Sequence, residues 1–189
     1  MNRANVLVEF PDRFGEARAE MEACLLLFQN SLSKSATVLS SLADLFRRQG
    51  DVAQAISQQR RALALREQLP SLADRAISHN NLAGYLGRSD TPPALAESSR
   101  HWLAALLYHL VAGLGQHLQT SLRNYAVLFR RAQAAGTELA IPRVADLLAD
   151  PAFAALEQSL RQRQVDLAEL QAAVDRFLDQ ARKAALDAK

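Results

Sequence analysis

The chain is poor in cysteine, in aromatic residues and in net charge. One of its 189 residues is cysteine, and aromatic residues make up 6%. A lone cysteine, Cys24, excludes an internal disulfide and fits a reducing compartment. Its position in the apolar run 24–28 predicts a small buried side chain. The formal net charge of +2 is too small to indicate a dedicated nucleic-acid binder.

Long apolar runs are also missing. The longest, residues 102–115, has 14 residues and contains His109, so it is too short to cross a bilayer. The first ten residues hold too short an apolar run for a secretory signal, and they include Glu9. We therefore expect a cytoplasmic protein with no membrane partner.

Good helix formers dominate the sequence, and strand-forming β-branched residues are sparse. An all-α protein follows. The sequence predicts helices over residues 14–33, 35–49, 52–69, 72–88, 94–111, 116–135 and 143–149, a further helix from about residue 150, and a last one over 165–185.

Turn residues mark several of the predicted boundaries. Gly50 closes one helix and Asp51 caps the next. Thr91 precedes two prolines and is the expected N-cap of the helix that follows them. Gly113 and Gly136 end two later helices. Pro142 and Pro151 bracket the predicted short helix over 143–149, and Asp150, which precedes Pro151, is the expected N-cap of the next helix.

One helical pattern occurs three times, starting at residues 42, 82 and 125, in steps of 40 and 43 residues. The copies are Leu42-Ala43-x-x-Phe46, Leu82-Ala83-x-x-Leu86 and Tyr125-Ala126-x-x-Phe129. Self-similarity at this period predicts helix–turn–helix repeats. A half-repeat precedes them, because residues 15–21 align with residues 50–56 at an offset of 35.

These residues resemble the tetratricopeptide repeat (TPR), in which small residues occupy the closest approach of two paired helices. Ala43, Ala83 and Ala126 match those positions. The chain departs from the pattern at Gln59, where an aromatic residue is usual, and at Pro142, which interrupts the third repeat. Its longer period resembles the long-helix repeats of kinesin light chains and of large bacterial signalling proteins.

The resemblance implies an all-α, TPR-like α-solenoid of antiparallel helix pairs with a C-terminal helical cap. Residues 1–136 would form the array, as a half-repeat (14–33) and three repeats (35–69, 72–112 and 116–136). Residues 137–189 would form the cap. No linker separates them, so we expect one continuous domain, compatible with a fragment of a longer array.

The resemblance also implies a concave groove lined by the first helices of the repeats. The residue before each Leu/Tyr-Ala pair would point into it, and arginines one turn on would bind carboxylates or phosphates. Arginine late in a helix also neutralises the helix C-terminus, which is the competing interpretation. The predicted groove residues are Ser41, Arg48, Asn81, Arg88, Arg123, Asn124 and Arg131.

Other chemistry is not indicated. His101, His109 and His117 recur every eight residues, which on one helix drifts by about 80° each time, so they predict no metal site. His79 falls at a core-facing position of the repeat. No catalytic or phosphate-binding motif is present. We expect neither enzymatic activity nor a cofactor.

The apolar stretch around Trp102 and Leu106 predicts the core of the second repeat, or alternatively an exposed face for another subunit. The first helix has an open flank, which predicts self-association.

Three functions remain. The leading prediction is a protein–protein interaction module that binds an acidic or extended peptide, or a protein partner, in the groove lined by Asn81, Asn124 and Arg131. The second is a structural scaffold or regulatory spacer within a larger bacterial signalling protein. The third, less favoured, is a nucleic-acid-binding repeat. Arg60, Arg61 and Arg66 would add to its basic surface, but the tyrosines do not interleave with the arginines.

Overall fold

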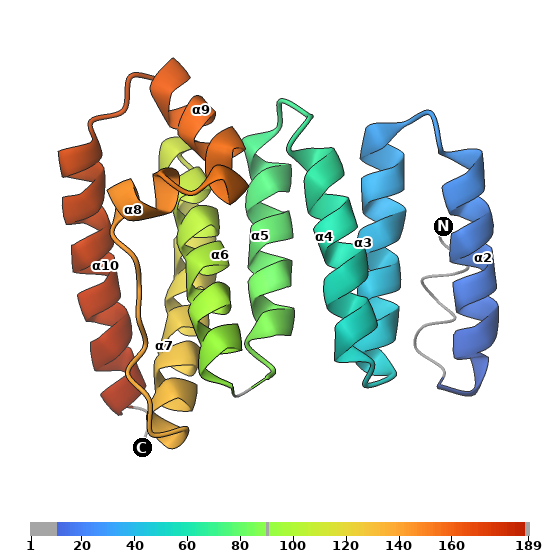
Figure 1. Cartoon of the computed structure of the whole chain (residues 1–189), viewed down its shortest axis with the longest axis horizontal. Helices are drawn as coiled ribbons and strands as arrows, with labels where there is room; N and C mark the ends of the chain where they lie inside the picture. The colour runs from blue at the N-terminus through green and yellow to red at the C-terminus, as the bar shows by residue number, and fades with distance from the viewer. Residues whose placement is uncertain (1–10, 90, 188–189) are drawn as a thin grey trace. The chain divides into compact units, whose positions relative to one another are not determined.

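The computed structural model describes residues 11–89 and 91–187, and all regular structure within them is helical (Figure 1). The all-α class is confirmed, while the solenoid arrangement stays a prediction. The elements are η1 (Pro11–Arg13), α2 (Phe14–Leu27), α3 (Leu32–Arg48), α4 (Val52–Arg66), α5 (Leu72–Leu86), α6 (Pro92–Val111), η2 (Gly115–His117), α7 (Leu118–Ala134), α8 (Val144–Leu148), η3 (Pro151–Phe153), α9 (Ala154–Gln162) and α10 (Leu167–Asp187).

The chain divides into two compact units, of which the first ends at Tyr85 and the second begins at Leu86. This division falls near the end of α5, whereas the sequence suggested a change of organisation at residue 136. Residues 137–187, expected to form a cap, belong to the same unit as α6 and α7.

The first unit is built around α3, which buries side chains on two of its faces. On one face Leu42 and Leu45 pack against Ala17 and Met21 of α2. On another, the predicted repeat residues Ala43 and Phe46 belong to a cluster with residues of α4 and α5. An apolar residue every three or four positions provides both faces, because a helix turns once in about 3.6 residues.

The turn between α2 and α3 comes earlier than predicted. The sequence predicted a helix over 14–33, but α2 ends at Leu27 and α3 begins at Leu32. Ser31 adopts an extended conformation (φ −126°, ψ 99°), and the Ser35 hydroxyl donates a 2.7 Å hydrogen bond to the Phe28 carbonyl oxygen. This side-chain contact stabilises the turn, and the apolar run 24–28 gave no sign of it.

The turn between α3 and α4 is confirmed as predicted. Gly50 has φ +83°, a left-handed conformation that a residue without Cβ adopts readily. The Asp51 carboxylate accepts a 3.0 Å hydrogen bond from the Gln54 backbone N–H and so caps α4.

The predicted equivalence of the first helix and α4 is not visible in their burial. At the offset of 35 residues, the buried Ala17 and Met21 correspond to Val52 and Ile56, which are half-buried. Ala55, which is fully buried in α4, corresponds to a glutamate in α2. The two helices therefore bury different positions.

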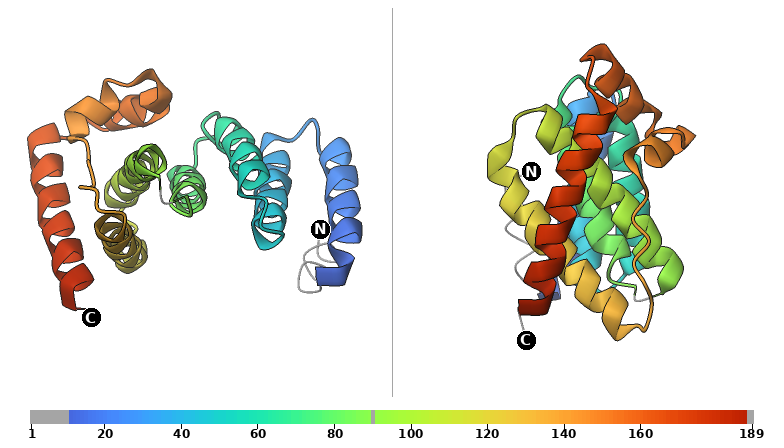
Figure 2. Two further views of the ribbon diagram at one scale, coloured as in Figure 1. Left: turned by 60° about the horizontal axis from the view of Figure 1, so that its bottom comes forward. Right: turned by 90° about the vertical axis from the view of Figure 1, so that its left-hand side faces the viewer.

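The second unit has α6 at its centre. α7 packs on α6, and α10 lies alongside α7 (Figures 1 and 2). Residues 101–109 of α6 are all buried, so the apolar stretch around Trp102 and Leu106 is core, as predicted. The Tyr125 hydroxyl of α7 donates a 3.0 Å hydrogen bond to the Ser99 carbonyl oxygen, and burial raises the pKa of Tyr125 well above its usual value.

The start of α6 matches the prediction only in position. Thr91 is the N-cap and the prolines occupy the first turn, but the Thr91 hydroxyl makes no capping hydrogen bond. It lies instead 3.2 Å from the Ser89 hydroxyl. The helix begins at Pro92, two residues before the predicted position.

The segment after α7 is tied to α6 by polar contacts. The Ser99 hydroxyl donates a 2.8 Å hydrogen bond to the Ala140 carbonyl oxygen, and Arg100 pairs with Asp150. Asp150 also accepts a 2.8 Å bond from the Ala152 N–H, which confirms its predicted capping role, although the first turn after it is the 3-10 turn η3.

Throughout the described ranges, no helix has both the length and the apolar character needed to cross a membrane.

Candidate functional site

Three predicted groove residues, Ser41, Arg48 and Asn81, lie in the first unit. Ser41 of α3 and Asn81 of α5 are half-buried, and Arg48 is exposed at the end of α3. The Arg48 Nε donates a 2.8 Å hydrogen bond to Asp44 Oδ2, and the neighbouring Arg47 Nε donates a 2.7 Å bond to Asp44 Oδ1. Arg48 is therefore already engaged by a carboxylate of its own helix.

Asp44 illustrates the local electrostatics of this helix end. Desolvation alone would raise the pKa of Asp44, but hydrogen bonds and charge from Arg47 and Arg48 outweigh it and lower the pKa. The carboxylate is thus held ionised between two cations. The arginines at the end of α3 therefore form ion pairs within their own helix. This agrees better with the competing interpretation, in which they are charges at a helix end, than with a role in binding a ligand.

The other four predicted residues, Arg88, Arg123, Asn124 and Arg131, lie in the second unit. Arg88 and Arg123 are exposed, and Asn124 is half-buried. Arg131 donates a hydrogen bond to the Gly87 carbonyl oxygen, so it stabilises the segment that precedes α6. Because the seven residues are divided between the units, a groove lined by all of them stays a prediction.

A buried polar cluster between α4 and α5 corrects the expectation that Arg66 adds to a basic surface. Arg66 is buried, and its Nη1 donates a 2.8 Å hydrogen bond to the Ser78 hydroxyl. Gln59, fully buried where the TPR pattern has an aromatic residue, donates a 3.2 Å bond to the Ser78 carbonyl oxygen. Burial lowers the pKa of Arg66. The sequence did not predict the burial of Arg66, because local spacing places this residue at a helix end but does not show that α5 packs against it.

The same interface confirms that His79 is a packed core side chain, since it is 1% exposed. Its Nε2 lies 3.7 Å from a carboxylate oxygen of Glu67, whose pKa is raised by burial. Arg75 of α5 donates hydrogen bonds to the carbonyl oxygens of Glu67 (2.8 Å) and Leu69 (2.6 Å). It therefore satisfies carbonyl groups just past the end of α4, in the manner of a C-terminal cap.

Two histidines that were not expected to share a face meet in the second unit. The rings of His109 and His117 stack with centroids 5.0 Å apart and planes 19° apart. The eight-residue drift applies to one continuous helix, whereas the chain turns at Gly113 (φ +67°) between α6 and η2. Burial, with the charge of His117, lowers the pKa of His109 to about 4.

An apolar hollow of about 440 Å³ lies in the first unit where α2, α3 and α4 meet. Its apolar walls are Leu25 and Leu26 of α2, Leu39 of α3, and Ala64 and Leu65 of α4. This volume falls within the range of about 300–1,000 Å³ found for ligand-binding pockets. The sequence predicted an open flank on the first helix and a concave groove elsewhere, and none of the predicted groove residues lines this hollow.

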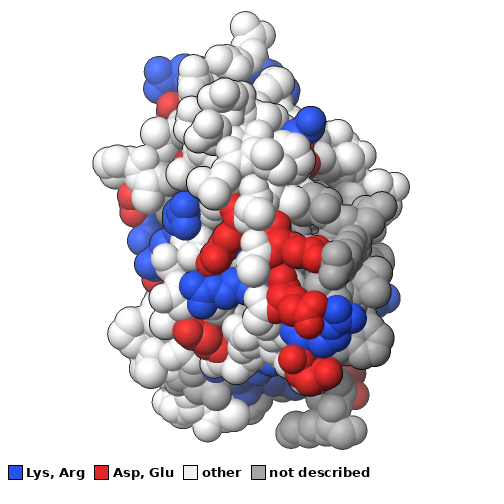
Figure 3. All heavy atoms as spheres, turned by 90° about the vertical axis from the view of Figure 1, so that its right-hand side faces the viewer, with Lys and Arg blue, Asp and Glu red and all other residues white. Residues whose placement is uncertain are grey.

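Two adjacent leucines, Leu26 in the wall of the hollow and Leu27 next to it in the sequence, have most of their surface in solvent. Leu26 is 72% exposed and Leu27 is 79% exposed. Figure 3 shows the face formed by α2, where acidic and basic side chains gather over the middle and the upper part is mostly uncharged. Exposed apolar surface next to a concavity is typical of interaction sites.

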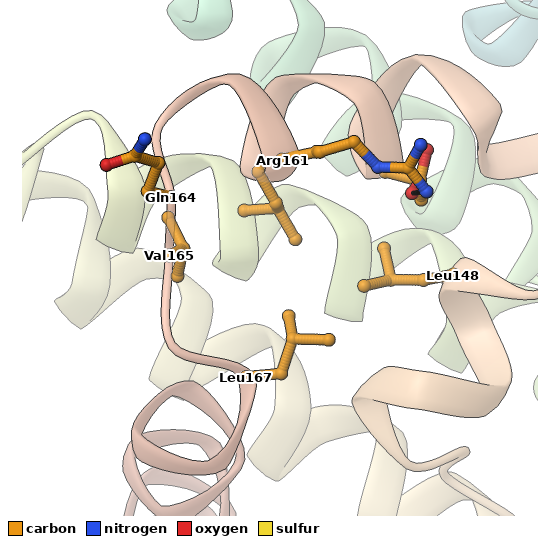
Figure 4. A pocket seen from close by; sticks show the side chains of 7 residues that line it. Leu148, Arg161, Gln164, Val165 and Leu167 are labelled. Atoms are coloured by element: carbon orange, nitrogen blue, oxygen red, sulfur yellow. Dashed lines mark ion pairs between the residues drawn. The ribbon is translucent and has the colours of Figure 1, made fainter.

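A second hollow, of about 420 Å³, lies in the second unit at the turn between α9 and α10. Leu148, Val165 and Leu167 reach it from three different segments (Figure 4). At its edge Arg161 and Glu157 form an ion pair of 2.5 Å. The two charged side chains that line this hollow therefore neutralise each other.

Across the part of the chain that the structure describes, no three histidine, cysteine or carboxylate side chains are arranged to hold a metal ion. No protein-family model, no curated protein and no solved structure matches this chain.

Proposed function

We propose that this chain is a non-enzymatic protein-interaction module that binds a peptide or protein partner through its helical surface. The observation that carries the proposal is the apolar hollow between α2, α3 and α4, flanked by Leu26 and Leu27. Covering these side chains would contribute about 25 cal/mol for each Å² of apolar surface removed from water. A partner that fills the hollow gains that free energy.

The proposal includes a TPR-like architecture for the helical pairs. It is supported by burial at the three small positions, since Ala43 and Ala83 are 0% exposed and Ala126 is 5% exposed. Repeat arrays of this kind use surfaces between successive helices to hold extended or helical segments. The nucleic-acid alternative is less favoured, because Arg66 is buried and Arg47 and Arg48 are paired with Asp44.

Affinity capture from an extract of cells that express the protein tests this function. The wild type is compared with a Leu26→Ser/Leu27→Ser variant and with a Leu186→Ser control, in which an exposed leucine of the other unit is changed. We expect a partner that the wild type and the control retain and the double variant loses. Circular dichroism and thermal unfolding verify that all three proteins fold, because exposed substitutions change stability by only about 0.5 kcal/mol.

A fourth variant, Asn81→Ala/Asn124→Ala, separates the hollow from the predicted groove. Loss of the partner only in this variant would move the interface to the groove residues. Equal capture by every variant, or capture by none, would contradict binding at the hollow and favour the spacer function.

A further inference from the structure

We propose that the hollow between α2, α3 and α4 binds an amphipathic helix that carries leucine-like side chains on one face and carboxylates beside them. This inference rests on the interaction function proposed above and specifies the chemistry of the partner.

The shape of the hollow favours a helix as the occupant. Its walls come from α2, α3 and α4, so the concavity lies between three helices. A ridge of side chains on a fourth helix fits such a concavity, as in ordinary helix–helix packing. A bilayer surface has no comparable ridge, so it would leave the concavity unfilled.

The charges at the hollow favour an acidic partner. Arg61 of α4 lines it, and the Arg61 Nη1 donates a 2.7 Å hydrogen bond only to the neutral Gln58. Lys34, next to the lining residue Ser35, lies with its Nζ 5.0 Å from the centroid of the Phe28 ring. Among the described residues, no carboxylate forms an ion pair with either cation. Carboxylates of a partner would supply the missing charge.

The acidic side chain on the last turns of α2 does not compensate these cations. Glu22 accepts a 2.8 Å hydrogen bond from the Arg18 Nε of its own helix. Lys34 and Arg61 are thus left without a carboxylate partner among the described residues, and a partner that supplies one would be acidic.

The site is also ordered before binding. The Ser31 N–H donates a 2.7 Å hydrogen bond to the Phe28 carbonyl oxygen, which also accepts the Ser35 hydroxyl at 2.7 Å. The Phe28 N–H in turn bonds to the Cys24 carbonyl oxygen at 3.0 Å. These bonds hold the α2–α3 turn, so a ligand pays little free energy to order the walls.

Synthetic peptides test the inference with the full chain. Three helical peptides of about 18 residues are used, because shorter helices are marginal in water. The first has two leucines one turn apart flanked by glutamates. The second has lysines in place of the glutamates, and the third has serines in place of the leucines. Fluorescence anisotropy of labelled peptides, titrated with protein to about 1 mM, gives each Kd.

We expect the acidic leucine peptide to bind at least about tenfold more tightly than the other two. A Lys34→Glu/Arg61→Glu variant should reverse the order of the glutamate and lysine peptides. The control Arg176→Glu/Lys183→Glu changes net charge equally with two exposed cations of α10 and should leave the order unchanged. Equal binding of both charged peptides, or an order unaffected by Lys34→Glu/Arg61→Glu, would overturn the inference.

The outcomes separate the two proposals. If both leucine peptides bind equally and Leu26→Ser/Leu27→Ser abolishes both, the hollow is an interaction site but the partner is not acidic. Light scattering that shows dimers lost in Leu26→Ser/Leu27→Ser would instead make a second copy the occupant. Sedimentation with vesicles of anionic lipid, with no peptide binding, would make a membrane surface the occupant.

Discussion

At the scale of single residues, burial changes the role of side chains that look like surface charge in the sequence. Arg66 occupies the last turn of α4, where a cation commonly neutralises the helix end. It is buried instead, beside the fully buried Gln59 and Ser78. Polar groups in such an interface must pair with one another, because each unpaired group costs about 1–3 kcal/mol. Gln59, a departure from the TPR pattern, meets this requirement only through its amide nitrogen, because its buried Oε1 has no hydrogen-bond partner among the described residues.

Gln164 offers a prediction at the same scale. It has φ +53° at the end of α9, where the Val165 N–H bonds to the Leu160 carbonyl oxygen. A left-handed conformation costs a residue with a Cβ about 1–2 kcal/mol, and glycine escapes this cost. Glycine also loses more chain entropy on folding, which offsets part of this gain. Gln164→Gly should therefore raise the free energy of unfolding by about 0.5–1 kcal/mol.

Urea denaturation followed by circular dichroism measures this change. Gln162→Gly is the matched control, because Gln162 is exposed and lies within α9. There the same substitution should lower stability by up to about 1 kcal/mol. A loss of stability in both variants would show that Gln164 is not strained.

At the scale of elements, the turns between helices decide which side chains meet. The turn after α6 brings His117 back over His109. The His109 Nδ1 lies 3.3 Å from the Ser121 hydroxyl oxygen. The earlier start of α3 leaves Leu26 and Leu27 at the open end of α2. Both outcomes follow from a short turn, while the helices themselves follow the predicted periodicity.

The His109 pair predicts a loss of stability in acid. The pKa of His109 falls from 6.5 to about 4 in the folded chain, so between these values the unfolded chain binds a proton that the folded chain does not. With respect to this group, the free energy of unfolding is therefore highest above about pH 6.5, where His109 is neutral in both states, and it decreases as the pH falls toward 4. The loss should total about 1–3 kcal/mol.

Denaturation curves between about pH 7 and pH 4.5 for the wild type and His109→Gln check this. Glutamine keeps a polar group near Ser121 but does not titrate. The variant should therefore show a shallower dependence of unfolding free energy on pH, whatever its stability at neutral pH. Parallel curves for the two proteins would contradict the assignment.

At the scale of the whole molecule, the chain divides between residues 85 and 86, and each of the two units has buried residues of its own. In the first unit Leu45 is fully buried beside residues of α2. In the second unit Leu106 is fully buried within α6. Truncating a buried leucine to alanine costs about 2–5 kcal/mol.

We expect that cost to remain within the unit that carries the substitution. Hydrogen exchange should show lower protection over residues 11–85 in Leu45→Ala and over residues 86–187 in Leu106→Ala. Equal loss of protection across both ranges in either variant would mean that the two units unfold together.

The sequence by itself determined the helical class, the caps at Asp51 and Asp150, and the burial of small residues such as Ala43. These depend on interactions between residues a few positions apart, which periodicity and turn chemistry record directly. Only the tertiary structure decided that Arg66 is buried and that a hollow opens beside Leu26. Each of these depends on which helices pack together, and contacts between distant segments leave no local pattern in the chain.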